Sequence, residues 1–389
     1  MKLRIYMIAY SQVDREMRDG GSRIFAETAK CGVARGHDVH VFTSEEGFES
    51  FRNYGLINLH YTVIRSSRYR RLGIYLLYVI RAVKLLLLMM KLIPKEANTV
   101  IYSSSDFWPD SIPAWILKMR FKNVKWIAGF YLFAPNPLSA ESPYKGKRFI
   151  RGLLYYLSQL PVYYLVRRYA DMVWVTSEPD RWMFGSRLSP EKVVAVRGGV
   201  DVKTPASIPE PAKKRFDAVF IGRFHPQKGV LELVDIWRFV CQKRKSAMLA
   251  VIGVGDLEDE LRKKISDYGL ENNIVLFGFK DGVEKLRIFK DSKVVVHPAI
   301  YDSGGMAACE AMACGLPGVS FDLPALKTYY PKGMLKTPCF DLKAFAENIL
   351  KLLNDANLYK KTGKDALDLA EEWDWDKRAE ELLEAIKRA

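Results

Sequence analysis

The hydrophobic pattern of the first half of the chain alternates between strand-like and helix-like segments. Short apolar runs rich in Val, Ile and aromatic residues predict strands, and longer segments with apolar residues three or four positions apart predict helices. Alternation of this kind favours a parallel, doubly wound sheet of the α/β class. The predicted strands are 2–10, 37–44, 56–64, 99–105, 124–132 and 171–177, and the predicted helices are 20–36, 74–93, 111–121 and 148–169.

The pattern is interrupted near 202–213, where three prolines with Ser and Thr predict a linker. Beyond it the alternation resumes, with predicted strands at 217–224, 247–255, 273–279, 293–300 and 317–322, and predicted helices at 229–244, 257–269, 283–292 and 342–355 before a Trp-containing terminal helix.

This pattern predicts two doubly wound Rossmann-like domains that are joined by a linker and face each other across a ligand cleft. The expected boundaries are 1–205 for a basic first domain and 206–372 for a second domain. A terminal helix at 373–389 is expected to cross back to the first domain. In such sheets, ligands bind at the carboxyl ends of the strands.

Length and composition agree with two domains. The chain has 389 residues, of which 49% are apolar, enough for two sizeable cores. Its five cysteines show no C-x-x-C spacing and favour packing thiols in a reducing, cytoplasmic setting. The amino terminus has charges inside its apolar run, and therefore predicts a first strand rather than a signal peptide.

The net charge of +15 is unevenly placed. Residues 1–205 hold 31 Lys and Arg against 17 Asp and Glu, whereas residues 206–389 hold 29 against 28. Two stretches, 51–95 and 142–170, contain no acidic residue at all. Such fields attract nucleic acid, anionic lipid or phosphorylated substrates.

The residues next to these cations favour one of these binding partners over the others. They are aliphatic and aromatic, which favours an anionic membrane surface over nucleic acid. Cations such as Arg81, Lys84 and Lys91 interrupt the apolar run, so it does not predict a span. The alternative is that both segments are helices that only cover a parallel sheet, with their charges on a solvated edge.

The segment Y-D-S-G-G-M-A-A-C-E-A-M-A-C-G-L-P, residues 301–317, carries the strongest candidate chemistry. A strand leads into a turn with Gly304 and Gly305, and a helix of small residues follows. We expect the amides of Gly305, Met306 and Ala307 to point at an anion above the helix.

Two carboxylates in this segment need an explanation. Asp302 has an ordinary structural interpretation as a cap on the helix. Glu310 has none, because it lies two turns into an apolar helix, where an unpaired carboxylate costs several kcal/mol. Ribose hydroxyls are hydrogen-bond donors that would satisfy it.

A second group of candidates follows the strand at 217–224, in the segment G-R-F-H-P-Q-K-G. Arg223 and Lys228 stand at the carboxyl end of this strand, where two cations can bind a diphosphate.

Together these segments resemble the second domain of the retaining, GT-B-fold nucleotide-sugar glycosyltransferases, specifically glycosyltransferase family 4. The resemblance rests on G-R-F-H-P-Q-K-G, on V-I-G-V-G-D-L-E-D-E-L-R-K-K, on L-F-G-F, and on two acids separated by seven residues. In the first half it is looser and rests on Gly20 and Gly21, on G-H-D-V-H-V-F-T, on V-T-S-E-P-D-R-W and on 199–201.

The resemblance implies a GT-B arrangement in which 1–205 binds the acceptor and 206–372 binds the nucleotide-sugar. It also implies a role for each matching position. Arg223 and Lys228 would hold the diphosphate, and Asp302 would contact a sugar hydroxyl. Glu310 would bind the ribose. The remaining implied contacts to sugar, phosphate and base come from Gly20, Gly21, Gly304, Gly305, Met306, Ala307, Ala308, Gly278 and Phe279.

The implied reaction moves a sugar from a UDP- or GDP-linked donor to a lipid-linked or membrane-displayed glycan acceptor, with retention of configuration and with neither a metal nor a cofactor. The basic, apolar first half suggests a peripheral protein on the inner face of the cell membrane. Two other functions stay open: a GT-B sugar epimerase or phosphorylase, and a catalytically silent scaffold.

The scaffold alternative is motivated by two differences from the family pattern. Asp302 stands where the family usually has Glu, and Tyr131 is the residue nearest to the usual His of the first domain. Other signals carry less weight. The segment 253–255 lacks the third glycine of a dinucleotide fingerprint, the acids of 374–376 suit a helix start rather than a metal site, and His297 is expected to be structural.

Overall fold

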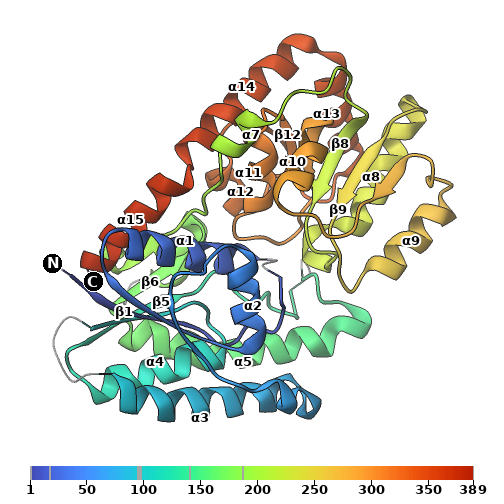
Figure 1. Cartoon of the computed structure of the whole chain (residues 1–389). Coiled ribbons are helices and arrows are strands. Elements are labelled where there is room, and N and C mark those ends of the chain that lie inside the picture. The colour runs from blue at the N-terminus through green and yellow to red at the C-terminus, as the bar shows by residue number, and fades with distance from the viewer. Residues whose placement is uncertain (1, 17–18, 94–98, 140–141, 186–187, 389) are drawn as a thin grey trace. The chain divides into compact units, whose positions relative to one another are not determined.

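The computed structural model describes residues 2–16, 19–93, 99–139, 142–185 and 188–388. The chain divides into two compact units. The first comprises residues 1–137, 146–198 and 376–389, and the second comprises 138–145 and 199–375. Each unit is built on its own parallel sheet, as Figure 1 shows.

The first unit contains seven parallel strands in the order β3-β2-β1-β4-β5-β6-β7. The strands are β1 (Arg4–Ala9), β2 (Asp38–Thr43), β3 (His60–Val63), β4 (Thr99–Ser103), β5 (Val124–Gly129), β6 (Met172–Val175) and β7 (Val193–Ala195). Residues of β1, β4, β5 and β6 are almost all buried, as expected for a parallel sheet that is covered on both faces.

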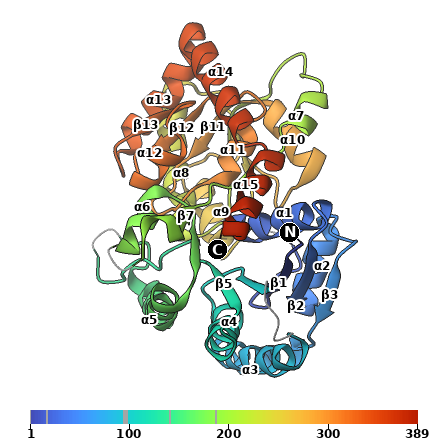
Figure 2. The same ribbon diagram turned by 90° about the vertical axis from the view of Figure 1, so that its left-hand side faces the viewer.

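Helices cover this first sheet on both faces. The helices are α1 (Gly20–Ala34), α2 (Glu45–Asn53), α3 (Ile74–Leu92), α4 (Trp108–Arg120), α5 (Phe149–Tyr169), α6 (Glu178–Met183) and α15 (Trp375–Arg388), with short 3-10 turns at Ser67–Leu72, Gly146–Arg148 and Pro190–Lys192. Helix α4 packs between α3 and α5, and these three lie on the opposite face of the sheet from α1 and α2 (Figures 1 and 2).

The second unit contains six parallel strands in the order β10-β9-β8-β11-β12-β13. These are β8 (Phe216–Ile221), β9 (Leu249–Ile252), β10 (Ile274–Leu276), β11 (Ser292–His297), β12 (Gly318–Phe321) and β13 (Met334–Thr337). The helices are α7 (Lys203–Ser207), α8 (Val230–Lys243), α9 (Glu258–Asp267), α10 (Gly282–Lys290), α11 (Met306–Met312), α12 (Pro324–Tyr329), α13 (Leu342–Asn354) and α14 (Ala356–Glu372), with a 3-10 turn at Pro226–Lys228. Two apolar clusters fill the opposite faces of this sheet.

The predicted α/β class with two parallel, doubly wound sheets is confirmed. The pattern did not predict α2, α6, α12, or the short strands β7 and β13 near the sheet edges. The expected linker contains the short helix α7, and the terminal helix expected at 373–389 corresponds to α15. The pattern did not predict α14, and α14 and α15 are separate helices. They separate at Trp373, whose backbone oxygen accepts a hydrogen bond from Val200 N at 2.8 Å.

One glycine of the second unit has no space for a side chain. Gly229 precedes α8 with φ of 63°, and a Cβ placed there would lie 1.9 Å from the carbonyl oxygen of Pro298. Gly269 has the same φ of 63° and has no neighbour within 4 Å of such a Cβ. Substitution of Gly269 by Ala therefore measures only the free-energy cost of a left-handed residue with a side chain. Substitution of Gly229 measures that cost together with the cost of the close approach to Pro298.

We predict that Gly269→Ala lowers the free energy of unfolding by about 1 kcal/mol, the cost of a left-handed residue with a side chain. Gly229→Ala should lower it by at least about 2 kcal/mol more, because the backbone around Pro298 must also move. Urea denaturation of the two variants measures the difference. Equal losses would show that the approach of Gly229 to Pro298 is not a constraint.

Candidate functional site

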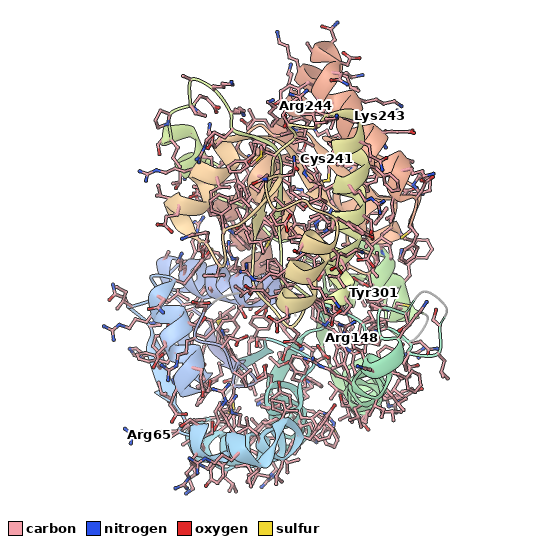
Figure 3. The ribbon with its side chains drawn as sticks, turned by 90° about the vertical axis from the view of Figure 1, so that its right-hand side faces the viewer. Arg65, Arg148, Cys241, Lys243, Arg244 and Tyr301 are labelled. Carbon is pink, nitrogen blue, oxygen red and sulfur yellow. The ribbon has the colours of Figure 1, made fainter. Side chains whose placement is uncertain are left out.

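The candidate site lies at the carboxyl edge of the second sheet, where the adjacent strands β8 and β11 end. The loops that follow them are joined, because Ile300 N donates to Gln227 O at 3.0 Å. Figure 3 labels Tyr301 in this loop, and Cys241, Lys243 and Arg244 at the opposite edge of the unit, near the end of α8.

Asp302 is the centre of a buried polar cluster. Its carboxylate accepts a hydrogen bond from Lys228 Nζ at 2.6 Å, and lies 3.1 Å from His297 Nε2. The backbone amide of Ser303 also donates to it, at 2.9 Å. Its side chain is only 8% exposed. The structure therefore brings together Lys228 and Asp302, which the sequence predicted as separate site residues.

The expectation that Asp302 caps a helix is wrong. Helix α11 begins at Met306, and its N-cap residue is Gly305, three residues beyond Asp302. The carboxylate is used instead by a lysine and a histidine from two other segments.

The charges around Asp302 fix its protonation. Burial alone would raise the pKa of this carboxyl, but the Lys228 ammonium and the His297 hydrogen bond hold the pKa well below its usual range. Burial lowers the pKa of His297, and its bond to Asp302 opposes this shift only in part. We conclude that His297 is neutral, and that it donates Nε2–H to an ionised Asp302.

Gly305 is required by the same cluster. Its φ is 94°, and a Cβ on it would lie 2.6 Å from His297 Nε2. The Tyr330 hydroxyl donates to the Gly305 carbonyl and accepts from Cys309 N at 3.1 Å. Ala308 N donates to Gly305 O at 3.0 Å. Among the predicted residues, Gly304 and Gly305 thus form the turn into α11 after Asp302, and Met306, Ala307 and Ala308 are the first residues of that helix.

Glu310 differs from the expectation. It is not an unpaired carboxylate in an apolar helix, because Lys285 Nζ of α10 lies 3.0 Å from its Oε2. Lys285 also reaches Asp281 Oδ1 at 2.6 Å, and its side chain is only 5% exposed. The buried charge of Glu310 is therefore compensated within the protein. The need for ribose hydroxyls, inferred from the sequence alone, does not follow.

The other predicted residues of this unit lie on loops at the same sheet edge. Arg223 follows β8 and is exposed. Gly278 and Phe279 follow β10, and Gly278 O accepts a hydrogen bond from Gly253 N at 2.9 Å. No recorded contact of the described residues joins Arg223 to the Asp302 cluster.

Gly20 and Gly21 begin α1 of the first unit. Asp19 caps this helix, since its carboxylate accepts from Ser22 N at 2.8 Å. A Cβ on Gly21 would lie 2.9 Å from the ring of Tyr131, which follows β5. Tyr131 is partly buried, and its hydroxyl is hydrogen-bonded to that of Tyr102. Gly21 is therefore needed locally to admit the Tyr131 ring.

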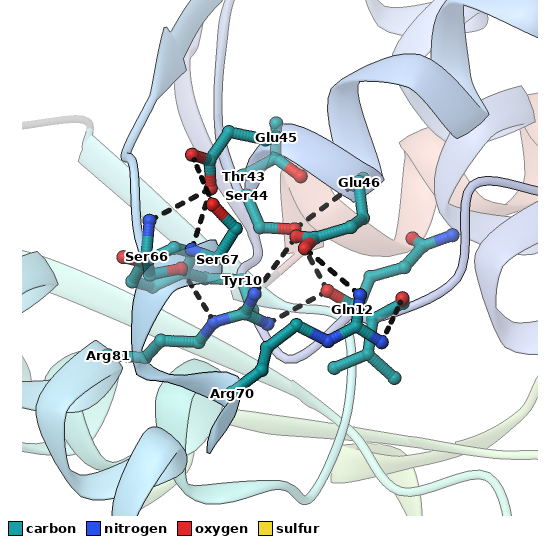
Figure 4. A network of polar contacts seen from close by, with 12 residues as sticks. Tyr10, Gln12, Thr43, Ser44, Glu45, Glu46, Ser66, Ser67, Arg70 and Arg81 are labelled. Atoms are coloured by element: carbon teal, nitrogen blue, oxygen red, sulfur yellow. Dashed lines mark hydrogen bonds and ion pairs between the residues drawn. The ribbon is translucent and has the colours of Figure 1, made fainter. Parts of the chain in front are cut away.

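A second buried ion pair holds the loop after β1. Arg81 of α3 is fully buried and donates to Tyr10 O at 2.9 Å and to Gln12 O at 2.8 Å. It also pairs with Glu46 at 3.1 Å (Figure 4). Arg81 therefore lies neither on a solvated edge nor on a lipid-facing surface, the two alternatives for the cations of this segment, but joins α3 to the carboxyl edge of the first sheet.

Sequence reasoning missed Lys285 and gave His297 only a structural role. The signal for Lys285 was weak: a lysine four residues after Asp281 predicts a surface pair on a helix. His297 is the last residue of a strongly apolar strand, which is the position that faces a ligand edge in a parallel sheet. Among the described residues, no group of three His, Cys, Asp or Glu side chains could hold a metal ion.

The cluster lies within a segment that matches a known family. Residues 204–368 match the family model described as glycosyl transferases group 1, and this range includes Lys228, His297, Asp302 and Glu310. The match shows that this part of the second unit is similar to that family.

Curated relatives resemble this chain over part of their length. An uncharacterized glycosyltransferase of Methanocaldococcus jannaschii is 26% identical over 219 residues, which are 54% of this chain and 52% of the relative. A phosphatidyl-myo-inositol mannosyltransferase of Mycobacterium leprae is 28% identical over 197 residues, 49% of this chain and 52% of the relative. The chain thus spans about half the length of these relatives.

The solved structure of Anabaena HepE in complex with UDP and glucose is similar over the whole chain. It has a TM-score of 0.76 and 15% sequence identity, and the match covers 100% of both chains. At this identity the likeness shows the fold alone, which is GT-B.

The buried histidine predicts a pH dependence of stability. His297 has a pKa below its ordinary value of about 6.5 in the folded state, so the unfolded chain binds more protons below that pH. We therefore expect stability to fall as the pH drops below about 6.5, by up to about 1.4 kcal/mol per pH unit from this group. Urea denaturation between pH 8 and 5 measures it, with His297→Gln as the control variant.

The groups that face His297 are Asp302, Lys228 and Lys336. In His297→Gln the amide retains a donor toward Asp302, and this contribution should disappear from the pH profile. His37 and His40 also have lowered pKa values, but they are common to both proteins and cancel in the difference. Identical pH profiles for the two proteins would contradict a neutral, buried His297.

Proposed function

We propose that this protein is a glycosyltransferase that moves a sugar from a nucleoside-diphosphate-sugar donor to a lipid-linked or membrane-displayed acceptor. The observation that carries the proposal is the buried cluster of Lys228, Asp302 and His297 at the carboxyl edge of the second sheet, within the residues that match the family. In this proposal the second unit holds the donor and the first unit holds the acceptor.

Two cations at this sheet edge, Arg223 and Lys228, are suited to a diphosphate. Arg223 is exposed beside β8 and presents a planar fork of donors, which matches phosphate oxygens. Lys228 has a partly exposed side chain, at 20%, although it is paired with Asp302. Both cations would stabilise the negative charge that develops on the leaving nucleoside diphosphate.

The two acids are suited to hydroxyl groups of the donor. Asp302 is kept ionised by Lys228, and a sugar hydroxyl would donate to this carboxylate in competition with the side-chain and backbone donors that already surround it. Glu310 is kept beside Lys285 and is still 13% exposed, which leaves room for a ribose hydroxyl. Each acid is thus already charged and oriented before a ligand arrives.

Backbone groups and loops complete the proposed donor site. The amides at Gly304, Gly305, Met306, Ala307 and Ala308 would contact sugar and phosphate, and Gly278 and Phe279 would line the base. Gly20 and Gly21 of the first unit would approach the diphosphate. Transfer with retention, by front-face attack with the departing phosphate as base and without a metal, fits this set of fixed charges.

The acceptor side is argued from the layer formed by α3, α4 and α5. Helix α3 exposes Leu76, Val79, Val83, Leu87 and Met90 along one side, and each is at least 44% exposed. The outer side of α5 is similar, with Ile150, Leu154, Leu157 and Tyr164 exposed.

Cations such as Arg71, Lys91, Arg151 and Arg168 are exposed beside these apolar side chains. Apolar side chains with flanking cations suit a peripheral contact with anionic lipid at the inner face of the cell membrane. In the described part of the chain, no helix has both the length and the apolar character to cross a bilayer.

A catalytically silent scaffold is the second candidate. It is favoured by the observation that Asp302 and Glu310 are both already paired with lysines, so neither acid needs a ligand to be stable where it is. Binding of a nucleotide decides between the two candidates.

We predict that the purified protein binds UDP or GDP, and that Glu310→Gln weakens this binding at least tenfold, since a charged acceptor is worth about 1.5 kcal/mol or more. A thermal-shift panel of nucleotide-sugars followed by calorimetry measures it. Glu284→Gln, which alters an exposed acid paired with Lys280, is the matched control and should bind normally. If neither nucleotide binds the wild type, the scaffold is the better account.

We also predict that the wild type sediments with vesicles containing phosphatidylglycerol at low salt, and that Val83→Asp combined with Leu87→Asp lowers its vesicle affinity at least tenfold. The variant loses apolar contact, at about 1.5 kcal/mol or more per side chain, and gains repulsion. Val283→Asp with Leu367→Asp makes the same change at exposed positions of the second unit, and should sediment normally. Absence of sedimentation of the wild type would end the membrane proposal.

A further inference from the structure

The first unit contains a pocket that the donor site does not use. It lies among α3, the start of α4, and α5, and has a volume of about 70 Å³. Its walls are largely aromatic, and Asp106 and Gln159 provide its most buried polar groups, being 8% and 6% exposed. The aromatic residues are Tyr75, Tyr78, Phe107, Trp108 and Tyr155.

The polar groups of the pocket are fixed in orientation. Gln159 Nε2 donates to Asp106 Oδ2 and to Leu132 O, both at 2.8 Å. Gln159 Oε1 accepts from Ala134 N at 2.7 Å. Both donor hydrogens of this amide are therefore occupied, and the group offered to a ligand is the Asp106 carboxylate, which accepts only part of the hydrogen bonds that two oxygens can accept.

The pocket selects against anions. None of its lining residues is Lys or Arg, and burial raises the pKa of Asp106 to about 6, so the carboxyl is largely ionised at pH 7.5. A phosphate next to this carboxylate would be repelled, whereas a hydroxyl would donate a hydrogen bond to it. The aromatic walls suit the apolar part, or the ring face of a sugar.

The position of the pocket fits an amphiphilic ligand. Asp106 is three residues beyond β4, at the carboxyl edge of the first sheet. The pocket walls include Ile74 and Tyr75 of α3 and Tyr155 of α5, the two helices whose outer sides expose apolar residues. A ligand with its polar end at Asp106 therefore finds an apolar surface on both sides of the pocket.

We infer that this pocket binds the hydroxyl-bearing end of a neutral amphiphile, and that the glycosyl acceptor is a neutral hydroxylated lipid or glycolipid rather than a phosphorylated one. The role as acceptor rests on the proposed function. The binding of a neutral amphiphile does not rest on it.

The experiment measures binding of two probes with the same tail by NMR titration: octyl glucoside below its micelle concentration, and octyl phosphate. The wild type should bind the glucoside, and bind it more tightly than the phosphate. Asp106→Asn should weaken binding of octyl glucoside about tenfold and strengthen binding of octyl phosphate. The ratio of the two affinities should therefore fall, or the variant should bind the phosphate more tightly. Both titrations are done without any nucleotide, so their result is independent of donor binding.

A second variant guards against misfolding of Asp106→Asn. Ser158→Leu fills the pocket without changing Asp106, and should abolish glucoside binding. Ser158 Oγ donates to the carbonyl three residues earlier at 2.8 Å, and Ser207 Oγ of α7 does the same at 2.8 Å, so Ser207→Leu is a matched control that should bind normally.

Three outcomes overturn the inference: no glucoside binding by the wild type, tighter binding of octyl phosphate than of octyl glucoside, or glucoside binding that neither Asp106→Asn nor Ser158→Leu weakens. Glucoside binding by a protein that binds no nucleotide would contradict the proposed function and leave the pocket assignment standing. Nucleotide binding without glucoside binding would contradict the pocket assignment and leave the proposed function standing.

Discussion

The proposed donor site depends on one buried ion pair, between Lys228 after β8 and Asp302 after β11. Two adjacent parallel strands bring these residues together, although 74 positions separate them in the chain. An uncompensated carboxylate at this depth would cost several kcal/mol, so each partner requires the other. His297 is neutral and donates a hydrogen bond to Asp302. Gly305 has no side chain, and a Cβ at this position would clash with the ring of His297.

The pairing also changes what a ligand has to do. The sequence alone indicated that the Glu310 carboxylate needs hydrogen-bond donors from a ligand. In the structure, the Lys285 ammonium is already paired with this carboxylate. The charges of this edge are therefore present and oriented in the protein without a nucleotide. A donor would enter a preorganised electrostatic environment, and little reorganisation would be needed as charge develops on the leaving group.

Much of the fold was predictable because it follows from local pattern. Apolar runs of strand length alternate with amphipathic segments, and this alone indicates two parallel sheets and places Arg223, Lys228 and Asp302 at strand ends. The partners of the acids were not predictable, because Lys285 and His297 meet Glu310 and Asp302 through tertiary packing. Short strands such as β7, with three residues, carry too little pattern to detect, and the contact of Trp373 at the end of α14 with the ring of Tyr329 is formed only by tertiary packing.

The tertiary contacts of the first unit could not be predicted from its sequence either. Its acid-free, apolar stretches were visible in the sequence, but their assembly into one helical layer, and the burial of Arg81 against Glu46, required the structure.

The measurement that tests the central claim most directly is a crystal structure of the protein soaked with UDP. The account predicts diphosphate oxygens within hydrogen-bond distance of Lys228 Nζ and the Arg223 guanidinium, with ribose hydroxyls at Glu310. A nucleotide bound elsewhere, with the Lys228–Asp302 pair untouched, would contradict it.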